Sequence, residues 1–335
     1  MRFSDIIGQE HAKRILLNAV STGRLPHAFI FSGTEGTGKK SLATALTMLL
    51  NCPTPISDGG CGSCKICKQI ITGSFPDLHI VTPKKDKYKT SKISIDQIRD
   101  IYAKLSFVPM VKFRVIVIDH AEEMTEEASN AFLRILEEPP PNNIFILNVL
   151  EPLNLLPTIV SRCQNIKFYP VPEEKITDWL IKTKGLDSDT AVVVSKMSEG
   201  SIGKALELVE NDFLKKREEW LTLLVRLPTL SKEEVLSILE ELLENKDELI
   251  EILTVWRSWI RDLIVMKETS DKGLLINRDL SHMIERLSKR YLLDELMLVM
   301  SHIHEIEQSI SNKNRNISLL MRRVMMELYN LSLRL

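Results

Sequence analysis

A short apolar run, His27–Phe31, leads directly into the glycine-rich segment Gly33–Ser41, which reads GTEGTGKKS. The phosphate-loop pattern GxxxxGK(S/T) lies between a strand and a helix, and Gly33, Gly38 and Lys39 match it. Backbone N–H groups at the start of such a helix can cradle phosphate. The segment therefore favours a P-loop sheet over the alternative, a chain without a nucleotide site.

The residue after the loop lysine departs from this pattern. A small hydroxyl there would ligate the Mg²⁺ that bridges the terminal phosphates of a nucleotide. This chain has Lys40, which cannot ligate a metal and opposes one by its charge. Ser41 comes one position late, on a different face of the following helix. The loop could still hold phosphate, but hydrolysis is not expected.

A second departure follows another apolar run. Val115–Asp119 (VIVID) has the form of a buried strand that ends in an acid, and Asp119 could hold a metal through water. The next residue, where a glutamate would polarise the attacking water, is His120. Glu122 and Glu123 come later, where the chain has left the strand tip. Loss of both the metal ligand and the general base predicts a site without turnover.

Composition narrows the class of protein. The 335 residues are enough for two or three domains, and 44% hydrophobic with 27% charged residues is ordinary for a globular protein. The net charge of −1 gives no global drive toward DNA or membrane. No apolar run reaches about 18 residues, and the start lacks a signal-peptide core, so a cytoplasmic location without membrane contact is expected.

Four of the five cysteines lie close together: Cys52, Cys61, Cys64 and Cys67. Eight residues separate the first two and two residues separate each later pair, so they could supply four thiolates to a tetrahedral Zn²⁺. The loop-like segment 53–60 (PTPISDGG) could fold around such a metal. A redox CxxC motif and coincidence are the alternatives. No catalytic residue type surrounds the cluster, so the zinc is expected to be structural.

Strand-like and helix-like segments alternate over the first half of the chain. Strands are predicted at 27–31, 78–81, 113–119 and 144–148, and helices at 11–21, 42–50, 95–105 and 125–136, the last ended by prolines 139–141. Such alternation predicts an α/β fold in which a parallel sheet has helices on both faces.

After about residue 168 the pattern is helical. Helices are predicted at 173–183, 187–199, 202–209, 212–226, 231–245, 247–268, 279–288, 291–310 and 316–334. Trp256 and Trp259 lie one turn apart and are expected in a core.

A set of segments now points to a family. IIGQEH, RLPHAFIFSG, a phosphate loop with a four-cysteine insert, VIVIDHAEEM, NAFLRILEEPPP and LLPTIVSRCQ occur here in the order found in bacterial clamp-loader subunits of the AAA+ class. The resemblance is close over residues 1 to about 210 and looser beyond. It implies an AAA+ P-loop domain at 1–166 with a zinc-binding insert at 52–67, a small helical lid domain at 167–211, and an all-α collar at 212–335 that mediates oligomerisation.

Within this family the chain resembles the delta-prime subunits of DNA polymerase III more than the tau/gamma motor subunits. The motors have a hydroxyl where Lys40 stands, Asp-Glu where Asp119–His120 stands, and a sensor-2 arginine where Gly203 stands. The sensor-1 position, near Asn148, keeps a polar side chain. The cysteine insert resembles that of both kinds of subunit and does not discriminate.

One motif of the family is intact. Ser161, Arg162 and Cys163 follow the last predicted strand and a short helix. In the resembled family this arginine is a finger that enters a neighbour's ATP site, where it stabilises charge on the transferring phosphoryl group. An arginine after a strand is otherwise a surface charge, and the surrounding motif favours the finger. Cys163 is expected to be a small buried residue.

The resemblance implies a function. The chain is expected to be a non-hydrolysing stator in a complex with tau/gamma and delta subunits, which loads the beta sliding clamp onto primed DNA in replication. It would belong to a DNA-directed DNA polymerase (nucleotidyltransferase) holoenzyme without independent ATPase activity. ATP or ADP held by the degenerate site would have a structural role at most. The residues of that site are Gly33, Gly36, Gly38, Lys39 and Asp119. An active tau/gamma-type motor and an unrelated P-loop regulator or helicase-like remodeller are the alternatives.

A basic segment is a candidate for DNA contact. Lys84, Lys85, Lys87 and Lys89 lie in one polar loop that could meet phosphates. The alternative is a solvated surface loop.

Overall fold

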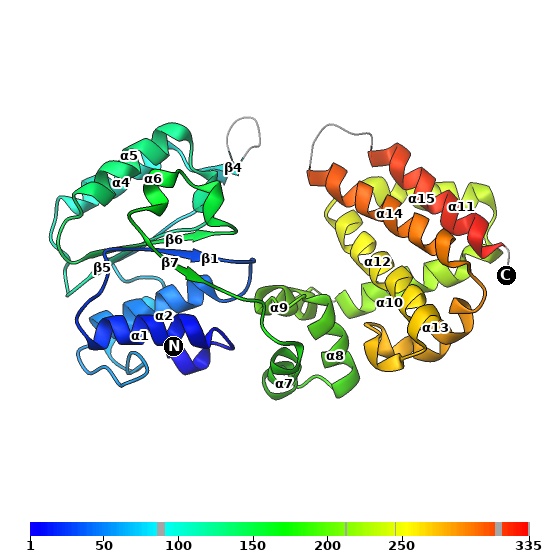
Figure 1. The fold of residues 1–335 in the computed structure, drawn as a ribbon, viewed down its shortest axis with the longest axis horizontal. Coiled ribbons are helices and arrows are strands. Elements are labelled where there is room, and N and C mark those ends of the chain that lie inside the picture. Colours follow the sequence, from blue (N-terminus) through cyan, green and yellow to red (C-terminus); the bar gives the residue numbers. More distant parts are fainter. Residues whose placement is uncertain (86–90, 212, 245, 312–316, 334–335) are drawn as a thin grey trace. The chain divides into compact units, whose positions relative to one another are not determined.

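The computed structural model describes residues 1–335 except 86–90, 212, 245, 312–316 and 334–335 (Figure 1). The chain divides into two compact units. One comprises Met1–Ile176 with Glu199–Lys204, and the other Thr177–Ser198 with Ala205–Leu335. The three domains predicted from the sequence, with boundaries after residues 166 and 211, stay a prediction.

Among the described residues, the first unit is built on a five-stranded parallel sheet with the order β2-β5-β6-β1-β7. The strands are β1 (Ala28–Ser32), β2 (Leu78–Val81), β5 (Arg114–Ile118), β6 (Asn143–Val149) and β7 (Gln164–Lys167), and β3 (Lys84–Lys85) with β4 (Ser91–Lys92) forms a separate antiparallel pair. Every residue of β1, β5 and β6 is buried, because these strands are covered on both faces.

Two helical layers provide this cover (Figure 1). The helices are α4 (Ile95–Leu105), α5 (Glu126–Glu137) and α6 (Pro157–Val160) on one face, and α1 (Glu10–Ser21) and α2 (Lys39–Asn51) on the other. Ile116 of β5 packs with the first layer and the next residue, Val117, with the second, since successive strand residues point to opposite faces. The predicted fold class, a parallel sheet between two layers of helices, is confirmed.

The last strand of the sheet differs from the prediction. The sequence pattern predicts no strand after 144–148, yet β7 pairs with β1 at the edge of the sheet. Within Gln164–Lys167 only Ile166 is buried, so an edge strand of this kind leaves no apolar run to find. Arg162 therefore precedes the last strand instead of following it.

After β7 the described chain is helical, as predicted. The helices are α7 (Glu173–Lys184), α8 (Ser188–Met197), α9 (Ile202–Glu210), α10 (Phe213–Arg226), α11 (Lys232–Glu244), α12 (Lys246–Thr269), α13 (Ser281–Ser288), α14 (Leu293–Ser311) and α15 (Ile317–Ser332), with short 3₁₀ turns η4 (Leu227–Thr229), η5 (Lys272–Leu274) and η6 (Arg278–Leu280). The first unit also contains the 3₁₀ turns η1 (Phe3–Asp5), η2 (Ala121–Glu123) and η3 (Pro152–Asn154), and the helix α3 (Lys65–Ile71), which was not predicted. In the second unit α12 packs against α10, α13 and α14. Trp256 and Trp259 of α12 are buried in this core, as expected.

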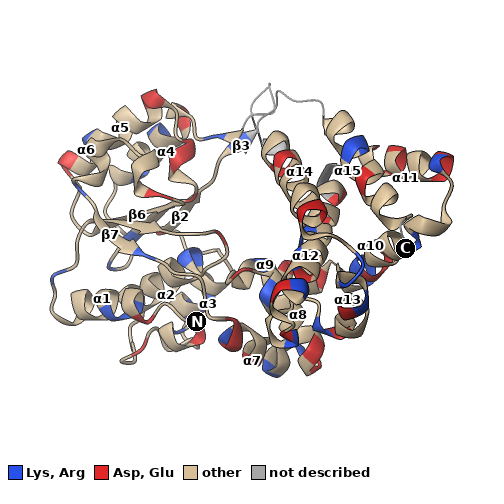
Figure 2. Cartoon of the chain, turned by 45° about the vertical axis from the view of Figure 1, so that its right-hand side comes forward, with Lys and Arg blue, Asp and Glu red and all other residues tan. Residues whose placement is uncertain are grey.

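Charges of both signs are interspersed over the helices of each unit (Figure 2). This distribution agrees with the net charge of −1. None of the described helices combines the length and apolar composition that crossing a bilayer requires.

Candidate functional site

The carboxyl ends of β1, β5 and β6 bring the predicted phosphate-site residues to one edge of the sheet. Ser32 at the end of β1 lies beside Val149 of β6, and Ile118 at the end of β5 lies beside Leu147. The loop after β1 and Asp119 after β5 therefore share this edge, where open α/β sheets bind ligands.

Glycine conformations shape the loop itself. Gly38 is the N-cap of α2 with φ 99°, and Gly33 has φ 139°, both in the region that side chains disfavour. A Cβ added at Gly33 would lie 2.3 Å from the carbonyl oxygen of Phe168. The loop therefore needs glycine at this position because its backbone passes so close to that of Phe168.

Lys39 is already satisfied by its own loop. Its amino group donates to the carbonyl oxygen of Gly33 and, at 2.9 Å, to that of Thr34. Burial lowers the pKa of Lys39, while the carboxylates of Glu35, Asp119 and Glu122 act in the opposite direction. The ammonium group that would meet a nucleotide's phosphates is thus held among internal acceptors.

The residues around the position predicted for a general base also have partners. His120 Nδ1 lies 3.5 Å from Glu35 Oε1, which joins the tip of β5 to the phosphate loop. Glu122 Oε1 accepts a hydrogen bond from the Leu150 amide at 3.2 Å. Lys92 Nζ lies 3.2 Å from a carboxylate oxygen of Glu123. Lys40, which follows the loop lysine, is exposed to solvent.

Asn148 and Asp119 lie in contact. The amide nitrogen Nδ2 of Asn148 donates to Asp119 Oδ1 at 2.9 Å. Asn148 Oδ1 and Glu122 Oε2 are buried and have no hydrogen-bond partner within the described residues. A water molecule or a cation at this edge would satisfy such acceptors.

Gly203 lies directly against the phosphate loop. Its amide donates to the Gly36 carbonyl at 3.0 Å, and a Cβ at Gly203 would lie 2.8 Å from the Gly36 Cα. Any side chain at position 203 would therefore force the backbone of the loop to move, and an arginine does not fit this arrangement.

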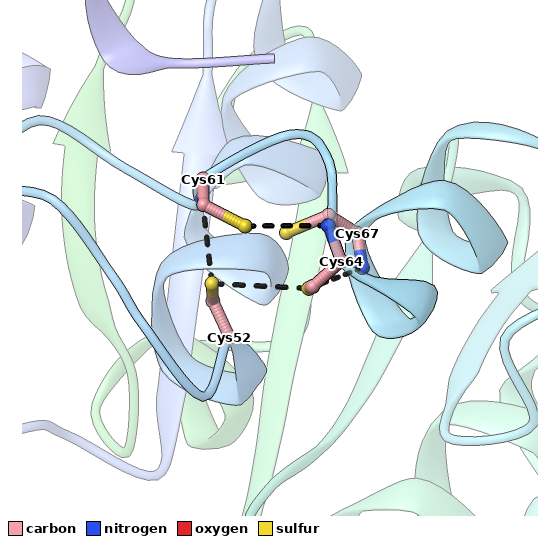
Figure 3. A group of neighbouring side chains, drawn as sticks. All are labelled: Cys52, Cys61, Cys64 and Cys67. Carbon is pink, nitrogen blue, oxygen red and sulfur yellow. Dashed lines mark hydrogen bonds between the residues drawn. The ribbon is translucent and has the colours of Figure 1, made fainter.

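The four clustered cysteines converge, as Figure 3 shows. Their sulfur atoms all lie within 4.8 Å of one another, and Cys52 Sγ is 4.0 Å from Cys64 Sγ. Zinc–sulfur bonds of about 2.3 Å in a tetrahedron place sulfurs about 3.8 Å apart. All five cysteines of the chain are described and none forms a disulfide. The group could hold a metal ion.

Backbone amides donate hydrogen bonds to sulfur atoms of this cluster. Cys64 is the N-cap of α3, and its sulfur accepts the Cys67 amide at 3.3 Å. Amide hydrogen bonds from Cys64 and Ser63 lower the pKa of Cys61 to about 5. Burial raises the pKa of Cys67 to about 12, so a bound cation would be needed to hold Cys67 as a thiolate.

Arg162 lies between α6 and β7 with its side chain 37% exposed. Its Nη2 donates to Glu137 Oε1 at 3.0 Å, and its Nη1 donates to the Thr158 carbonyl at 3.0 Å. These partners belong to α5 and α6. Cys163 beside it is half-buried against the sheet core, and burial raises its pKa to about 12.

Two contacts at these sites were not predicted from the sequence. Glu137 is 25 residues from Arg162, and Glu35 is far from His120 in the chain. A pairing over such a distance leaves no local pattern. The LEEPPP segment places an acid at the end of a helix, but it does not indicate which residue that acid meets.

The basic loop is described only in part. Lys84 and Lys85 form β3, drawn blue in Figure 2, and Lys92 belongs to its partner strand β4. Lys87 and Lys89 lie outside the described residues.

Comparison with known proteins decides the family. The family model "DNA polymerase III, delta subunit" matches residues 8–172, and "DNA polymerase III, delta subunit, C terminal" matches residues 211–329. DNA polymerase III subunit delta' of Bacillus subtilis is 30% identical over 311 residues, which is 91% of this chain and 87% of that protein. The chain belongs to the delta-prime family of DNA polymerase III subunits. It is thus a member of the clamp-loader subunit family.

Further relatives include both delta' and tau subunits. Subunit delta' of Escherichia coli is 32% identical over 204 residues, 61% of this delta-prime family member and 60% of that protein. Subunit tau of B. subtilis is 34% identical over 215 residues, 62% of this chain. The chain spans 37% and 39% of the length of the B. subtilis and E. coli tau subunits it matches.

Proposed function

We propose that this chain is the non-hydrolysing stator of a DNA polymerase III clamp loader and supplies Arg162 to the ATP site of a neighbouring motor subunit. The observation that carries the proposal is the contrast between two cations. Lys39 is held by the carbonyl groups of its own loop, whereas Arg162 is partly exposed at the surface.

Three features of the chain's own site support the absence of turnover. Lys40 stands where a metal-ligating hydroxyl belongs, and His120 stands where a general base belongs. The place of the sensor-2 arginine is Gly203, which has no room for a side chain. A nucleotide bound here would be held by backbone amides and would have a structural role at most.

Arg162 can accelerate hydrolysis at a neighbour's site without transferring a proton or forming a covalent bond. A guanidinium offers five N–H donors in one plane, which suit the oxygens of a transferring phosphoryl group. Charge develops on those oxygens in the transition state, so an arginine that meets them raises the rate of hydrolysis more than the affinity for ATP. Supplied in trans, such a residue is worth about 10³–10⁵ in rate.

The proposed function requires partner subunits, and the remaining parts of the chain have proposed roles in that complex. Tau/gamma and delta subunits are the proposed partners, and the clamp and primed DNA are met through the complex. The helices of residues 212–335 are proposed as the collar that joins the subunits, with residues 167–211 as the lid. Zn²⁺ held by Cys52, Cys61, Cys64 and Cys67 is proposed to have a structural role.

An active motor of tau/gamma type is the second candidate, favoured by the 34% identity to a tau subunit. It requires a displaced carboxylate as general base. Glu123 pairs with Lys92, and Glu122 uses one of its two oxygens to accept the Leu150 amide. The pairing of Glu123 weighs against its use as a base.

The test compares Arg162→Ala, Lys39→Ala and a surface control, Arg24→Ala, in the reconstituted complex. ATP hydrolysis stimulated by DNA and clamp is measured after equal assembly has been verified. We expect Arg162→Ala to lower the rate by about 10³ or more, and Lys39→Ala and Arg24→Ala to leave it unchanged. A collapse with Lys39→Ala and none with Arg162→Ala would establish the motor instead.

A further inference from the structure

The guanidinium of Arg162 is held by three residues. Its Nη2 donates to Glu137 Oε1 at 3.0 Å, and its Nη1 donates to the carbonyl of Thr158 at 3.0 Å and to the Ser161 hydroxyl at 3.5 Å. Thr158 and Ser161 are close neighbours of Arg162 in the chain. Glu137, the last residue of α5, is 25 residues away in the sequence.

The backbone that presents Glu137 is well anchored. Glu137 is the last residue of α5, whose start is capped by the Thr125 hydroxyl and whose last turns bury Ile135 and Leu136 in the sheet core. Glu138 is the C-cap, and prolines 139–141 after it cannot continue the helix. The Glu137 carboxylate therefore starts from a backbone with little freedom to shift.

These contacts orient the guanidinium and leave some of its donors unused. Arginine carries five N–H donors, and the bonds to Glu137, Thr158 and Ser161 use at most three of them. Donors remain for an anion. Both side chains are also partly exposed, 37% for Arg162 and 52% for Glu137, so an incoming phosphate can reach the pair.

We propose that Glu137 is a positioning residue, which holds the Arg162 guanidinium in the orientation that meets the neighbour's phosphoryl group. This inference rests on the proposed finger role of Arg162. A long side chain that is not held has to be ordered at each turnover, and loss of orientation slows the reaction step. An exposed ion pair adds little to folding stability, so the effect belongs in the rate and not in the fold.

The experiment uses the reconstituted complex and measures kcat and KM for ATP with clamp and primed DNA. Glu137→Ala is expected to lower kcat roughly 3- to 30-fold with KM unchanged, a smaller loss than removal of the finger itself. Glu137→Gln should recover much of this loss, because the oxygen of the glutamine amide can still accept a hydrogen bond from Arg162 Nη2. Glu138→Ala removes the same charge one residue later and should behave as wild type.

The double variant Glu137→Ala/Arg162→Ala separates positioning from a general structural effect. We expect it to be no slower than Arg162→Ala alone, since Glu137 acts through Arg162. A rate of the double variant below that of Arg162→Ala overturns the proposal. A Glu137→Ala rate equal to or above that of the wild type also overturns it, because the ion pair would then have no effect on Arg162 or would hold it back from the phosphate. If Arg162→Ala itself keeps full activity, the finger role fails and this inference fails with it. If Arg162→Ala collapses and Glu137→Ala does not, only the positioning role is lost.

Discussion

At the scale of single residues, the contact between Gly203 and Gly36 decides what the phosphate loop can accommodate. The two backbones meet because neither residue carries a Cβ, and the Gly203 amide is used by the Gly36 carbonyl. The first turn of α9 fills the space beside Gly36 with backbone, so a long side chain directed at phosphate does not fit at position 203 in this arrangement.

The Gly203→Ala substitution tests this contact. Alanine is favoured over glycine in a helix by about 1 kcal/mol, so without the contact the variant would be more stable. With its Cβ 2.8 Å from the Gly36 Cα, we expect a net loss of about 1–3 kcal/mol. Denaturant unfolding measures the change, and Glu207→Ala, an exposed position of the same helix, is the control. Stabilisation by Gly203→Ala would show that the loop and α9 are loosely packed.

At the scale of elements, burial determines what the sequence could predict. The strands β1, β5 and β6 are buried throughout, so each was visible as an apolar run, and their shared carboxyl edge placed the phosphate loop and Asp119 together. The edge strand β7 buries Ile166 alone and was missed. Glu137 was missed for a related reason, because a contact between elements is set by packing and has no signature in either segment.

The folded structure around the four clustered cysteines should depend on a bound metal ion. Cys52 ends α2, Cys64 begins α3, and Cys67 packs with Met48, Ile70 and Phe75. We expect one zinc per chain by elemental analysis. A chelator should raise hydrogen exchange over residues 52–71 while the exchange of β5 and β6 stays low. Cys64→Ser should give the same pattern, and Cys163→Ser should not. If residues 52–71 of the metal-free protein stay protected from hydrogen exchange, the apolar contacts of the cluster are sufficient to keep it folded.

At the scale of the whole molecule, each compact unit contains its own buried charged network. In the first unit Arg114 lies 3.2 Å from Asp77 and also donates to the Lys104 and Phe107 carbonyls. In the second, fully buried Asp262 accepts from the Ile276 and Asn277 amides, while Asn277 Oδ1 accepts from Arg217. Loss of one carboxylate leaves buried donors without an acceptor, which is costly.

Two substitutions should therefore destabilise different halves of the chain. Asp77→Ala is expected to cost about 3–5 kcal/mol in the first unit, and Asp262→Ala to cost a similar amount, about 3 kcal/mol or more, in the second. Hydrogen exchange resolved by peptide can assign each loss to its unit. Equal loss of protection in both units from either substitution would mean that the chain unfolds as one cooperative body.

The surface position of Arg162 has a thermodynamic consequence. If the guanidinium binds a nucleotide held by another subunit, the nucleotide and the subunit contact are linked, and each must strengthen the other by the same factor. Lys39 is satisfied within its own loop, so this linkage runs through Arg162 and not through Lys39. That part of the coupling free energy would be set by one side chain, and the affinity of this chain for its neighbour would depend on whether the neighbour holds ATP.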